Sequence, residues 1–395
     1  MKRTILIMLA ALLCVSSLAG CGSSQQTSSP ASQTASETSV PVKDDEPSKA
    51  ETPSSADTQS SEETPAPQPS EQEQPSEEAS EDDTEVTEEN GVIVVHQNGH
   101  YRALELFGGG TGNAYVSALN ELRSQLDGSI RIYSMIDPLP CAFYLPEEYS
   151  EYSVDQKESF DDIASRLDSG ITTVDAYSAL QQHTSENIYC RTDHHWMPLG
   201  AFYAAEAFAG AAGVPFKSLD TFRSETIPGF VGTMYAFTDG DINIKNDPED
   251  FIYYVPDNYP DCKTDFYDTS FNFDYTGSYF KEVGDPQSNA YLTFFGGDEQ
   301  IVKIRTNVKN GRKLMVVKDS YGNAIPGNLM NSFEEIYIAD MRYFNPNLVD
   351  FINTMGVTDV LFTMATFSAF GANADNLSEM ISQAKGNEIV DHYAD

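Results

Sequence analysis

Short apolar runs separated by polar turns dominate the chain from residue 91 onwards. The first two runs, at 92–95 and 101–106, flank Asn98 and Gly99. An Asn-Gly pair between strand-like runs is a strong signal for a two-residue hairpin turn. We therefore expect the folded part of the chain to open with a β-hairpin.

Helical and extended patterns then alternate. Tyr115, Leu119 and Leu122 recur at helical spacing and predict a helix over 114–126, and the apolar run 130–136 predicts a buried strand. The further predicted elements are, in chain order, helix 156–167, strands 171–174 and 188–191, a helix starting at Pro198, strand 313–317, helix 323–332, strand 336–338, helix 347–355, strand 359–363 and helix 375–385. This alternation favours a three-layer α/β/α fold built on a mostly parallel sheet.

Between about residues 217 and 300 the alternation gives way to aromatic, Asp-rich and Gly-rich sequence, including the run 251–254. Strand-like runs without helical patterns between them predict a β-rich insertion of hairpins and loops. We expect this insertion to lie within one domain that spans residues 91–395.

The first twenty residues have the layout of an export signal. Lys2 and Arg3 precede an apolar run at 4–15, and small residues follow up to Cys21. The apolar run is too short to span a bilayer comfortably. We expect residues 1–20 to be removed as a lipoprotein signal peptide and Cys21 to carry a lipid, so that the protein is extracytoplasmic and lipid-anchored to the cell membrane. The alternative is an ordinary signal peptide that happens to end in a cysteine.

Residues 21–90 consist mainly of Ser, Thr, Glu, Pro, Gln and Asp, with almost no large apolar side chain. Such a segment cannot bury enough apolar surface to offset the conformational entropy lost on folding. We expect a disordered acidic tether that repels itself, extends and holds the domain away from the membrane.

Charge and cysteine content exclude several classes of protein. The formal net charge is −38 at pH 7, and clustered Lys and Arg that would bind nucleic acid are absent from the sequence. Apart from Cys14 and Cys21, the cysteines are Cys141, Cys190 and Cys262, and their spacing argues against a zinc ribbon or a redox motif. One disulfide or three free thiols both fit this set.

Reactive side chains are expected where strands end, because active sites of open α/β sheets lie at the carboxyl ends of the strands. Residues 189–196 and 314–322 are two such places. In the second, Ser320 precedes a predicted helix, whose dipole, together with the Ser320 N–H, would stabilise an oxyanion. The same position also suits an ordinary helix N-cap.

The first segment pairs a carboxylate with an imidazole. If the chain is extended there, Asp193 and His195 project from one face and His194 from the other. A serine nucleophile needs a base within hydrogen-bond reach, and the base needs a group that fixes its tautomer. Ser320, His195 and Asp193 would fill these roles, with His194 as structural support. The competing use of Asp193, His194 and His195 is as metal ligands, but the sequence offers no further paired ligands, so we expect no metal.

The segment 192–196, Thr-Asp-His-His-Trp, resembles the signature of the DHHW proteins, and residues 313–344 resemble the second half of the same family. This family is similar to SGNH hydrolases and to the AlgX and AlgJ proteins that help to O-acetylate alginate outside the cytoplasm. The resemblance covers roughly residues 91–390 and implies an SGNH-like α/β fold.

The resemblance also implies roles for individual residues. The acid and base fall on Asp193 and His195, and the nucleophile falls on Ser320. Arg342 would face the site and bind a sugar or the acyl oxygen, or else serve as an ion-pairing arginine.

Three further residues near the two motifs have two interpretations each, and a fourth departs from the SGNH sequence pattern. Trp196 and Tyr321 would stack on a sugar ring, or pack inside the domain as aromatic side chains beside a buried motif often do. Asn323 is a candidate oxyanion donor or the start of the helix. Lys318 stands where ordinary SGNH proteins have the glycine of a Gly-Asp-Ser block.

Together these residues predict an extracytoplasmic acyl-ester enzyme that needs no cofactor. Ser320 would take an acetyl group and pass it to a saccharide hydroxyl or to water. The anchored location favours a cell-wall glycan or exopolysaccharide as substrate and a membrane-bound acyltransferase as partner. The alternative is a non-catalytic saccharide-binding or assembly lipoprotein with the same fold.

Overall fold

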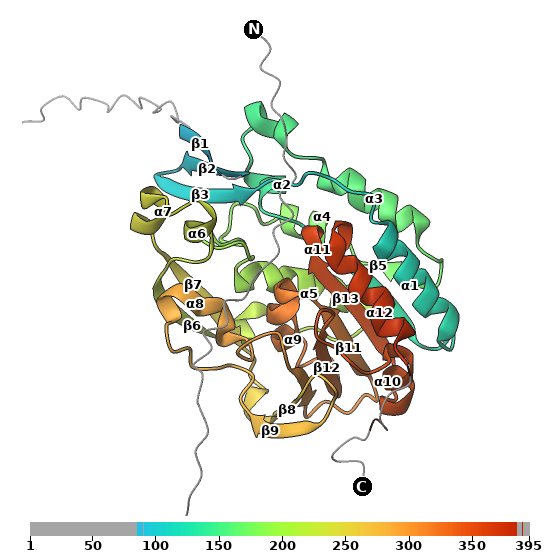
Figure 1. Ribbon diagram of the computed structural model, residues 1–395. Coiled ribbons are helices and arrows are strands. Elements are labelled where there is room, and N and C mark those ends of the chain that lie inside the picture. Colours follow the sequence, from blue (N-terminus) through green and yellow to red (C-terminus); the bar gives the residue numbers. More distant parts are fainter. Residues whose placement is uncertain (1–84, 90, 385–388, 390–395) are drawn as a thin grey trace, which may run out of the picture. The chain divides into compact units, whose positions relative to one another are not determined.

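The structure is a computed structural model that describes residues 85–89, 91–384 and 389 (Figure 1). The expected signal peptide, Cys21 and most of the expected tether lie outside these residues. Among the described residues, no helix combines the length and the apolar character needed to cross a membrane.

The described strands form three sheets. The large sheet has eight strands in the order β5-β4-β13-β11-β12-β10-β8-β9, a second sheet has the order β1-β2-β3, and β6 pairs with β7. The strands are β1 Glu85–Glu89, β2 Val92–Gln97, β3 His100–Glu105, β4 Arg131–Asp137, β5 Ile171–Thr173, β6 Arg223–Phe230, β7 Glu249–Val255, β8 Lys263–Tyr267, β9 Phe273–Gly277, β10 Ile301–Arg305, β11 Lys313–Lys318, β12 Glu335–Asp340 and β13 Asp359–Ala365.

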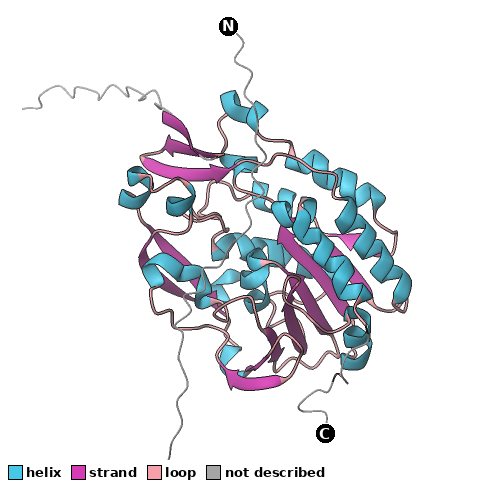
Figure 2. Cartoon of the chain, in the orientation of Figure 1, coloured by secondary structure: helices cyan, strands magenta, loops and turns pink. Residues whose placement is uncertain are grey.

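Helices cover both faces of the large sheet (Figure 2). The helices are α1 Asn113–Gln125, α2 Cys141–Tyr144, α3 Gln156–Arg166, α4 Ala176–Gln181, α5 Pro198–Ala212, α6 Met234–Phe237, α7 Ile242–Asn246, α8 Pro286–Asn289, α9 Ile325–Asn328, α10 Leu348–Met355, α11 Thr366–Phe370 and α12 Asp375–Ser382.

Strand β11 shows how the sheet separates two apolar cores. Leu314 and Val316 pack into the core that holds the buried face of α5, whereas Met315 and Val317 pack into the core formed with α1, α10 and α12. This division follows from the two-residue period of a strand, which sends successive side chains to opposite faces. A strand buried on both faces is expected to be apolar, and β11 is apolar from Leu314 to Val317, between a lysine at each end.

The predicted three-layer α/β/α fold with a mostly parallel sheet is confirmed. Strands β5, β4, β13, β11 and β12 pair in parallel, and the antiparallel strands β10, β8 and β9 extend the sheet beyond β12. The predicted hairpin forms between β2 and β3 around Asn98 and Gly99, both of which have positive φ. Most predicted helices and strands are confirmed within a few residues.

Three segments of the structure differ from the sequence prediction. The expected tether was placed up to residue 90, but β1 at Glu85–Glu89 already pairs with β2, because backbone pairing tolerates an acidic edge strand. The expected β-rich insertion at 217–300 also contains the short helices α6, α7 and α8, and its strands β8 and β9 belong to the large sheet. The predicted helix 323–332 is reduced to a 3₁₀ turn, Ser320–Ala324, and the four-residue α9.

The three cysteines of the described chain are free thiols. Cys141 and Cys190 are buried, and Cys262 is partly buried. Burial raises the pKa of Cys141 to about 11 and that of Cys262 to about 12, so both stay protonated at neutral pH.

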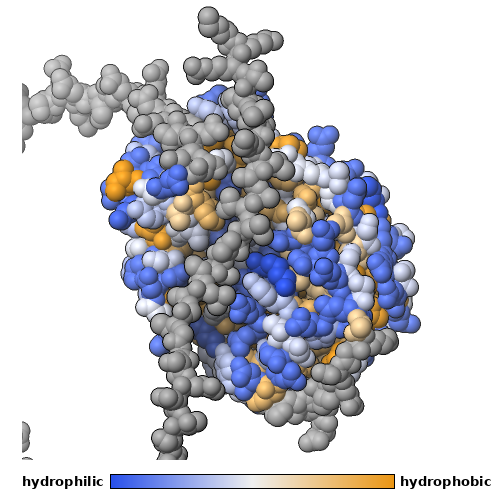
Figure 3. Space-filling model, viewed as in Figure 1, coloured by the Kyte–Doolittle hydropathy of each residue, from blue (hydrophilic) through white to orange (hydrophobic). Residues whose placement is uncertain are grey.

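Hydrophilic residues cover most of the face shown in Figure 3 where the folded residues are visible. The most exposed large apolar side chains, Ile242 at 59% and Val154 at 45%, come from separate elements. These two side chains therefore do not form one apolar patch, and the active site of such a sheet is expected at the ends of the parallel strands.

Candidate active site

The residues singled out in the sequence converge at the carboxyl ends of the central parallel strands. Ser320 follows β11, and Arg342 follows β12. Asp319 precedes Ser320, and its Oδ2 atom accepts a hydrogen bond of 3.0 Å from the N–H of Ala365, the last residue of β13. This contact fixes the turn that carries Ser320 to the neighbouring strand.

The predicted strand 188–191 does not form, and the loop 189–196 is not extended. It reverses direction, with an isolated bridge between Tyr189 and Trp196. The buried carboxylate of Glu249 accepts hydrogen bonds from the N–H groups of Arg191, at 2.7 Å, and Thr192, at 2.8 Å. An extended strand would pair these groups with another strand, so Glu249 gives the backbone an alternative partner and stabilises the loop.

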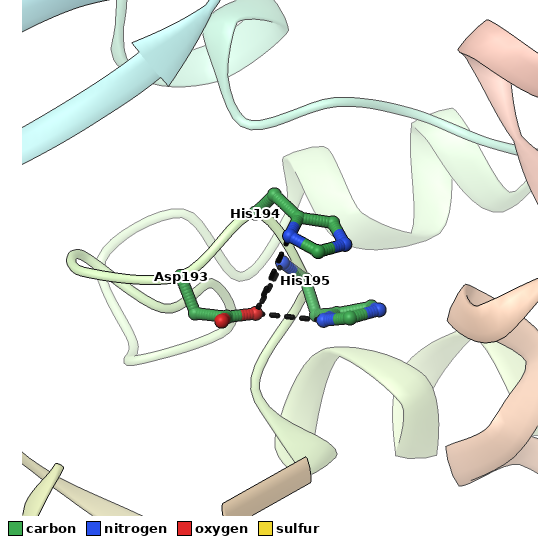
Figure 4. Close-up of side chains that lie close together, drawn as sticks. All are labelled: Asp193, His194 and His195. Carbon is green, nitrogen blue, oxygen red and sulfur yellow. Dashed lines mark hydrogen bonds and ion pairs between the residues drawn. The ribbon is translucent and has the colours of Figure 1, made fainter. Parts of the chain in front are cut away.

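The loop nevertheless places Asp193 and His195 together, and Ser320 beside them. The Asp193 Oδ1 atom lies 2.7 Å from Nδ1 of His195, and Nε2 of His195 lies 3.0 Å from Oγ of Ser320. The side chains of Asp193 and His195 are 5% and 9% exposed. Figure 4 shows the Asp193 carboxylate directed towards the His195 ring. A carboxylate, an imidazole and a hydroxyl thus form one hydrogen-bonded row.

Asp193 is held on both of its oxygens. Its Oδ1 also accepts the His195 N–H at 3.0 Å, and Oδ2 accepts the N–H of Thr233 at 2.9 Å and the Thr233 hydroxyl at 3.0 Å. Burial opposes ionisation, but His194, His195 and these hydrogen bonds outweigh it and hold the pKa of Asp193 below its usual range. Asp193 is therefore a carboxylate that can only accept hydrogen bonds.

His194 does not join the row but lies against it. Its Nδ1 is 2.6 Å from the Thr233 hydroxyl, and its ring centroid is 3.8 Å from that of His195. Burial and the neighbouring His195 lower the pKa of His194. The predicted structural role of His194 fits these contacts, although its side chain is still 24% exposed.

The turn at Ser320 differs from the predicted helix start. Asp319 is the capping residue, since its Oδ1 accepts the Tyr321 N–H at 3.0 Å, and the Ser320 hydroxyl is left to contact His195. Pro326 suits the start of the short α9, and no long helix runs from Ser320. The prediction that a helix dipole stabilises an oxyanion at Ser320 is therefore wrong. The Ser320 N–H, however, donates to no described residue and is free to bind an oxyanion.

Trp196 and Tyr321 lie inside the protein. Trp196 is fully buried and Tyr321 is 2% exposed, and the Trp196 Nε1–H donates to the Tyr321 carbonyl at 3.0 Å. The ring of Tyr291 stacks on His195, with centroids 3.8 Å apart and planes 7° apart. These contacts fit the packing interpretation of Trp196 and Tyr321, because their rings and polar atoms support the loop from inside.

Asn323 and Arg342 are also engaged within the protein. The Asn323 Nδ2 donates to Asp298 at 2.9 Å, and the Arg342 guanidinium contacts Asp298 at 2.8 Å and Asp340 at 2.7 Å. Lys318, 1% exposed, completes this cluster with bonds of 2.9 Å to both carboxylates. The Asn323 amide group is thus used inside the protein, and the contacts of Arg342 fit its ion-pairing interpretation.

A metal would have to compete with these hydrogen bonds. One ligand atom each from Asp193, His194 and His195 lies within 4.8 Å of the others. However, Asp193 and His195 are bonded to each other, and His194 Nδ1 contacts Thr233. The arrangement fits a hydrogen-bonded catalytic row at least as well as it fits a set of metal ligands.

A pocket of about 490 Å³ opens beside the ion-pair cluster. Asp298 belongs to both, and the residues that line the pocket are Tyr275, Lys281, Phe295, Gly296, Gly297, Asp298, Glu299, Gln300 and Tyr343. The pocket combines aromatic rings with charged and amide groups, and its chemistry suits a polar ligand.

Sequence reasoning missed three residues that support the row. Thr233 binds Asp193, Glu249 binds the loop, and Tyr291 stacks on His195. All three come from the segment 217–300, in which many similar residues occur, and no motif distinguishes them.

Known proteins resemble the chain in sequence and structure. A sequence model of the DHHW protein family matches residues 70–339. Among solved structures, a DHHW family protein from Eubacterium siraeum is 46% identical with a TM-score of 0.72, covering 76% of this chain and 98% of that one. PatB1 from Bacillus cereus, solved with a sulfonyl adduct, is 16% identical with a TM-score of 0.57, over 75% of this chain and 98% of PatB1. The O-acetyltransferase domain of Pseudomonas putida AlgJ is 15% identical with a TM-score of 0.42, over 74% and 98%.

No curated protein matches this sequence. The likeness to PatB1, at 16% identity, shows a shared fold.

Proposed function

This chain belongs to the DHHW protein family, and from that membership and the geometry of the site we propose that it is an extracytoplasmic acyl-ester enzyme, either an O-acetyltransferase or an acetylesterase. The observation that carries the proposal is the position of His195, whose two ring nitrogens contact Asp193 at 2.7 Å and Ser320 at 3.0 Å. This is the arrangement that a serine nucleophile needs.

In the first half-reaction the Ser320 oxygen attacks the carbonyl carbon of an acetyl ester. His195 Nε2 takes the Ser320 proton, and Asp193 holds the imidazole and stabilises its positive charge. The free Ser320 N–H donates to the oxyanion that develops. Collapse of the intermediate breaks the ester bond, and His195 returns the proton to the leaving alcohol.

In the second half-reaction a hydroxyl group attacks the acetyl-enzyme. His195 takes the proton of that hydroxyl and then gives it to Ser320 as the serine leaves. If the attacking group belongs to a saccharide, the product is a new acetyl ester. If it is water, the product is acetate. The two activities share every step except the choice of acceptor.

For the acceptor or substrate we propose a cell-wall glycan or an exopolysaccharide. A protein anchored outside the membrane through Cys21 would meet these polymers first. The pocket lined by Tyr275, Gln300 and Tyr343 supports this choice, since rings and amides suit a sugar. A membrane-bound acyltransferase would be the partner that delivers acetyl groups.

The test is hydrolysis of a fluorogenic acetyl ester by the purified chain and by the variants Ser320→Ala and His195→Ala. We expect each variant to lose activity by on the order of 10³-fold or more, because members of such a row act as a unit. Ser165→Ala is the matched control, since Ser165 is an exposed serine on α3 that should leave activity unchanged. Circular dichroism would establish that every variant is folded.

An inactive parent chain, or variants that keep parental activity, would reject the enzymatic proposal. The non-catalytic alternative would then be tested by retention of the chain on immobilised polysaccharide, where Ser320→Ala should bind as well as the parent.

A further inference from the structure

The hydrogen bonds around Thr233 determine which nitrogen of His194 carries the proton. Asp193 is ionised and can only accept, so the Thr233 hydroxyl, 3.0 Å from Asp193 Oδ2, must donate its single proton there. The same hydroxyl oxygen lies 2.6 Å from Nδ1 of His194. Since its proton is already used, the oxygen must accept, and Nδ1 of His194 must be the donor.

A neutral His194 with its proton on Nδ1 has a lone pair on Nε2. Burial and the adjacent His195 lower the pKa of His194 and favour this neutral form. No hydrogen bond from any described residue reaches Nε2 of His194. Neutral imidazole nitrogens of this kind are good acceptors, and a buried or half-buried one without a donor is costly unless water or a ligand supplies it.

The free nitrogen of His194 lies beside the reactive one of His195. The two rings are 3.8 Å apart, and Figure 4 shows their outer nitrogens directed to the same side. On that side Nε2 of His195 contacts Ser320 Oγ at 3.0 Å. The side chain of His194 is 24% exposed and Ser320 is partly exposed, so neither residue is closed off from solvent.

We propose that His194, held in the Nδ1–H tautomer by Thr233, binds the hydroxyl group adjacent to the one that reacts, so that the site selects acceptors that carry vicinal diols. This proposal rests on the proposed function and names its acceptor class. The attacking hydroxyl gives its proton to His195 and its oxygen bonds to the acetyl carbon. The neighbouring hydroxyl keeps its proton and donates a hydrogen bond to Nε2 of His194.

The first test measures the tautomer and does not depend on activity. In the chain labelled with ¹⁵N-histidine, NMR should show His194 protonated on Nδ1. Thr233→Ser keeps the hydroxyl and should keep this tautomer, whereas Thr233→Val, of the same shape, should shift it towards Nε2–H. A parent chain whose His194 carries its proton on Nε2 would overturn the proposal.

The second test compares matched acceptors. Acetyl transfer from a fluorogenic ester to trans-1,2-cyclohexanediol is measured against transfer to cyclohexanol, and the ratio cancels effects common to both. We expect the parent to favour the diol and His194→Asn, which keeps a donor near Thr233 but has no nitrogen at the Nε2 position, to lower the ratio by about 3- to 10-fold. An unchanged ratio would overturn the proposal.

The two proposals fail in different ways. If the parent shows no turnover with any acceptor, the proposed function fails. The diol site is then judged by titration, because binding of the diol should move the ¹⁵N resonance of His194 Nε2 more than cyclohexanol does. Equal shifts with both alcohols would reject the diol site as well.

Discussion

Asp193 has the most constrained side chain of the site. Two hydrogen bonds from His195 and two from Thr233 occupy its oxygens. Four donors around one buried carboxylate stabilise its negative charge and fix its orientation. Asp193 in turn fixes the His195 ring, so that Nε2 points at Ser320 before a substrate binds.

At this scale we predict that Asp193→Asn lowers kcat for ester hydrolysis by on the order of 10³- to 10⁴-fold. The amide removes the negative charge that stabilises the imidazolium and can turn an N–H towards His195, which favours the wrong tautomer. The measurement is steady-state kinetics on the folded variant. A loss below about tenfold would mean that Asp193 is only structural.

Gly232 provides a second residue-scale prediction. A Cβ atom placed on it would lie 2.3 Å from Oδ2 of Asp193, so Gly232→Ala must displace the carboxylate. We expect most of the activity to be lost while the chain stays folded. The matched control is Gly210→Ala on the exposed side of α5, where nothing lies within 4 Å and alanine should stabilise the helix by about 1 kcal/mol.

Asp193, His195 and Ser320 could be predicted from the sequence, because a carboxylate, an imidazole and a serine at strand ends are the residue types that a serine nucleophile and its base need. It could not indicate Thr233, Glu249 or Tyr291, whose contacts depend on how a long connecting segment folds back. It could not decide whether Trp196 and Tyr321 stack on a sugar or pack inside the domain, because an aromatic side chain beside a motif has the same sequence signature whether it is exposed or buried.

Among the elements, the ends of β11 and β12 are joined by a buried cluster of charges. Lys318 contacts Asp298 and Asp340, and Arg342 contacts the same two carboxylates. The lysine in place of a glycine therefore has a structural reason, since it lies under the turn that carries Ser320 and pairs with Asp340 on the neighbouring strand.

We predict that Lys318→Met lowers the free energy of unfolding by about 3 kcal/mol, because it removes one partner from a buried ion cluster. Lys309→Met is the control: Lys309 is 74% exposed and its contact with Glu334 is at the surface, so stability should not change measurably. Urea denaturation monitored by fluorescence measures both. Equal stability of the two variants would show that the cluster does not hold the strand ends.

The same cluster predicts a pH dependence. Burial opposes ionisation of Asp298, but Lys318 and Arg342 outweigh it and hold the pKa of Asp298 below its usual value. A depressed folded pKa contributes stability that is present above the unfolded value of about 4 and is lost as pH falls towards the folded value. We expect the free energy of unfolding to fall below about pH 4, and Asp298→Asn to make that fall shallower. A slope that Asp298→Asn leaves unchanged would assign the loss to other carboxylates.

Helices and strands with a strong local pattern were predictable. In α10, for example, Asn347 caps the first turn and Gly356 with φ 65° ends the helix, as their residue types suggest. The helix predicted at 323–332 failed because apolar spacing there reflects a tightly buried turn, in which Gly322 lies against Lys318 and Thr363. The antiparallel extension of the sheet was not predictable, since strand order depends on contacts far apart in the chain.

For the whole molecule, we propose that Cys21 anchors the chain to the cell membrane. Cys21→Ser should move the protein from the detergent phase to the aqueous phase on Triton X-114 partition, because one serine cannot carry the lipid. The catalytic variant Ser320→Ala should stay in the detergent phase. A Cys21→Ser chain that still enters the detergent phase would reject the lipid anchor.

The hydrogen-bonded row also has a consequence for when the chain becomes active during folding. Its two halves, His195 and Ser320, are 125 residues apart in sequence, and the turn with Ser320 is held through Ala365 on β13. Contacts between distant residues form late in folding, because the intervening chain must be ordered first. We therefore expect a nascent or partly folded chain to lack the contact between Ser320 and its base, and to become active only when β13 has joined the sheet.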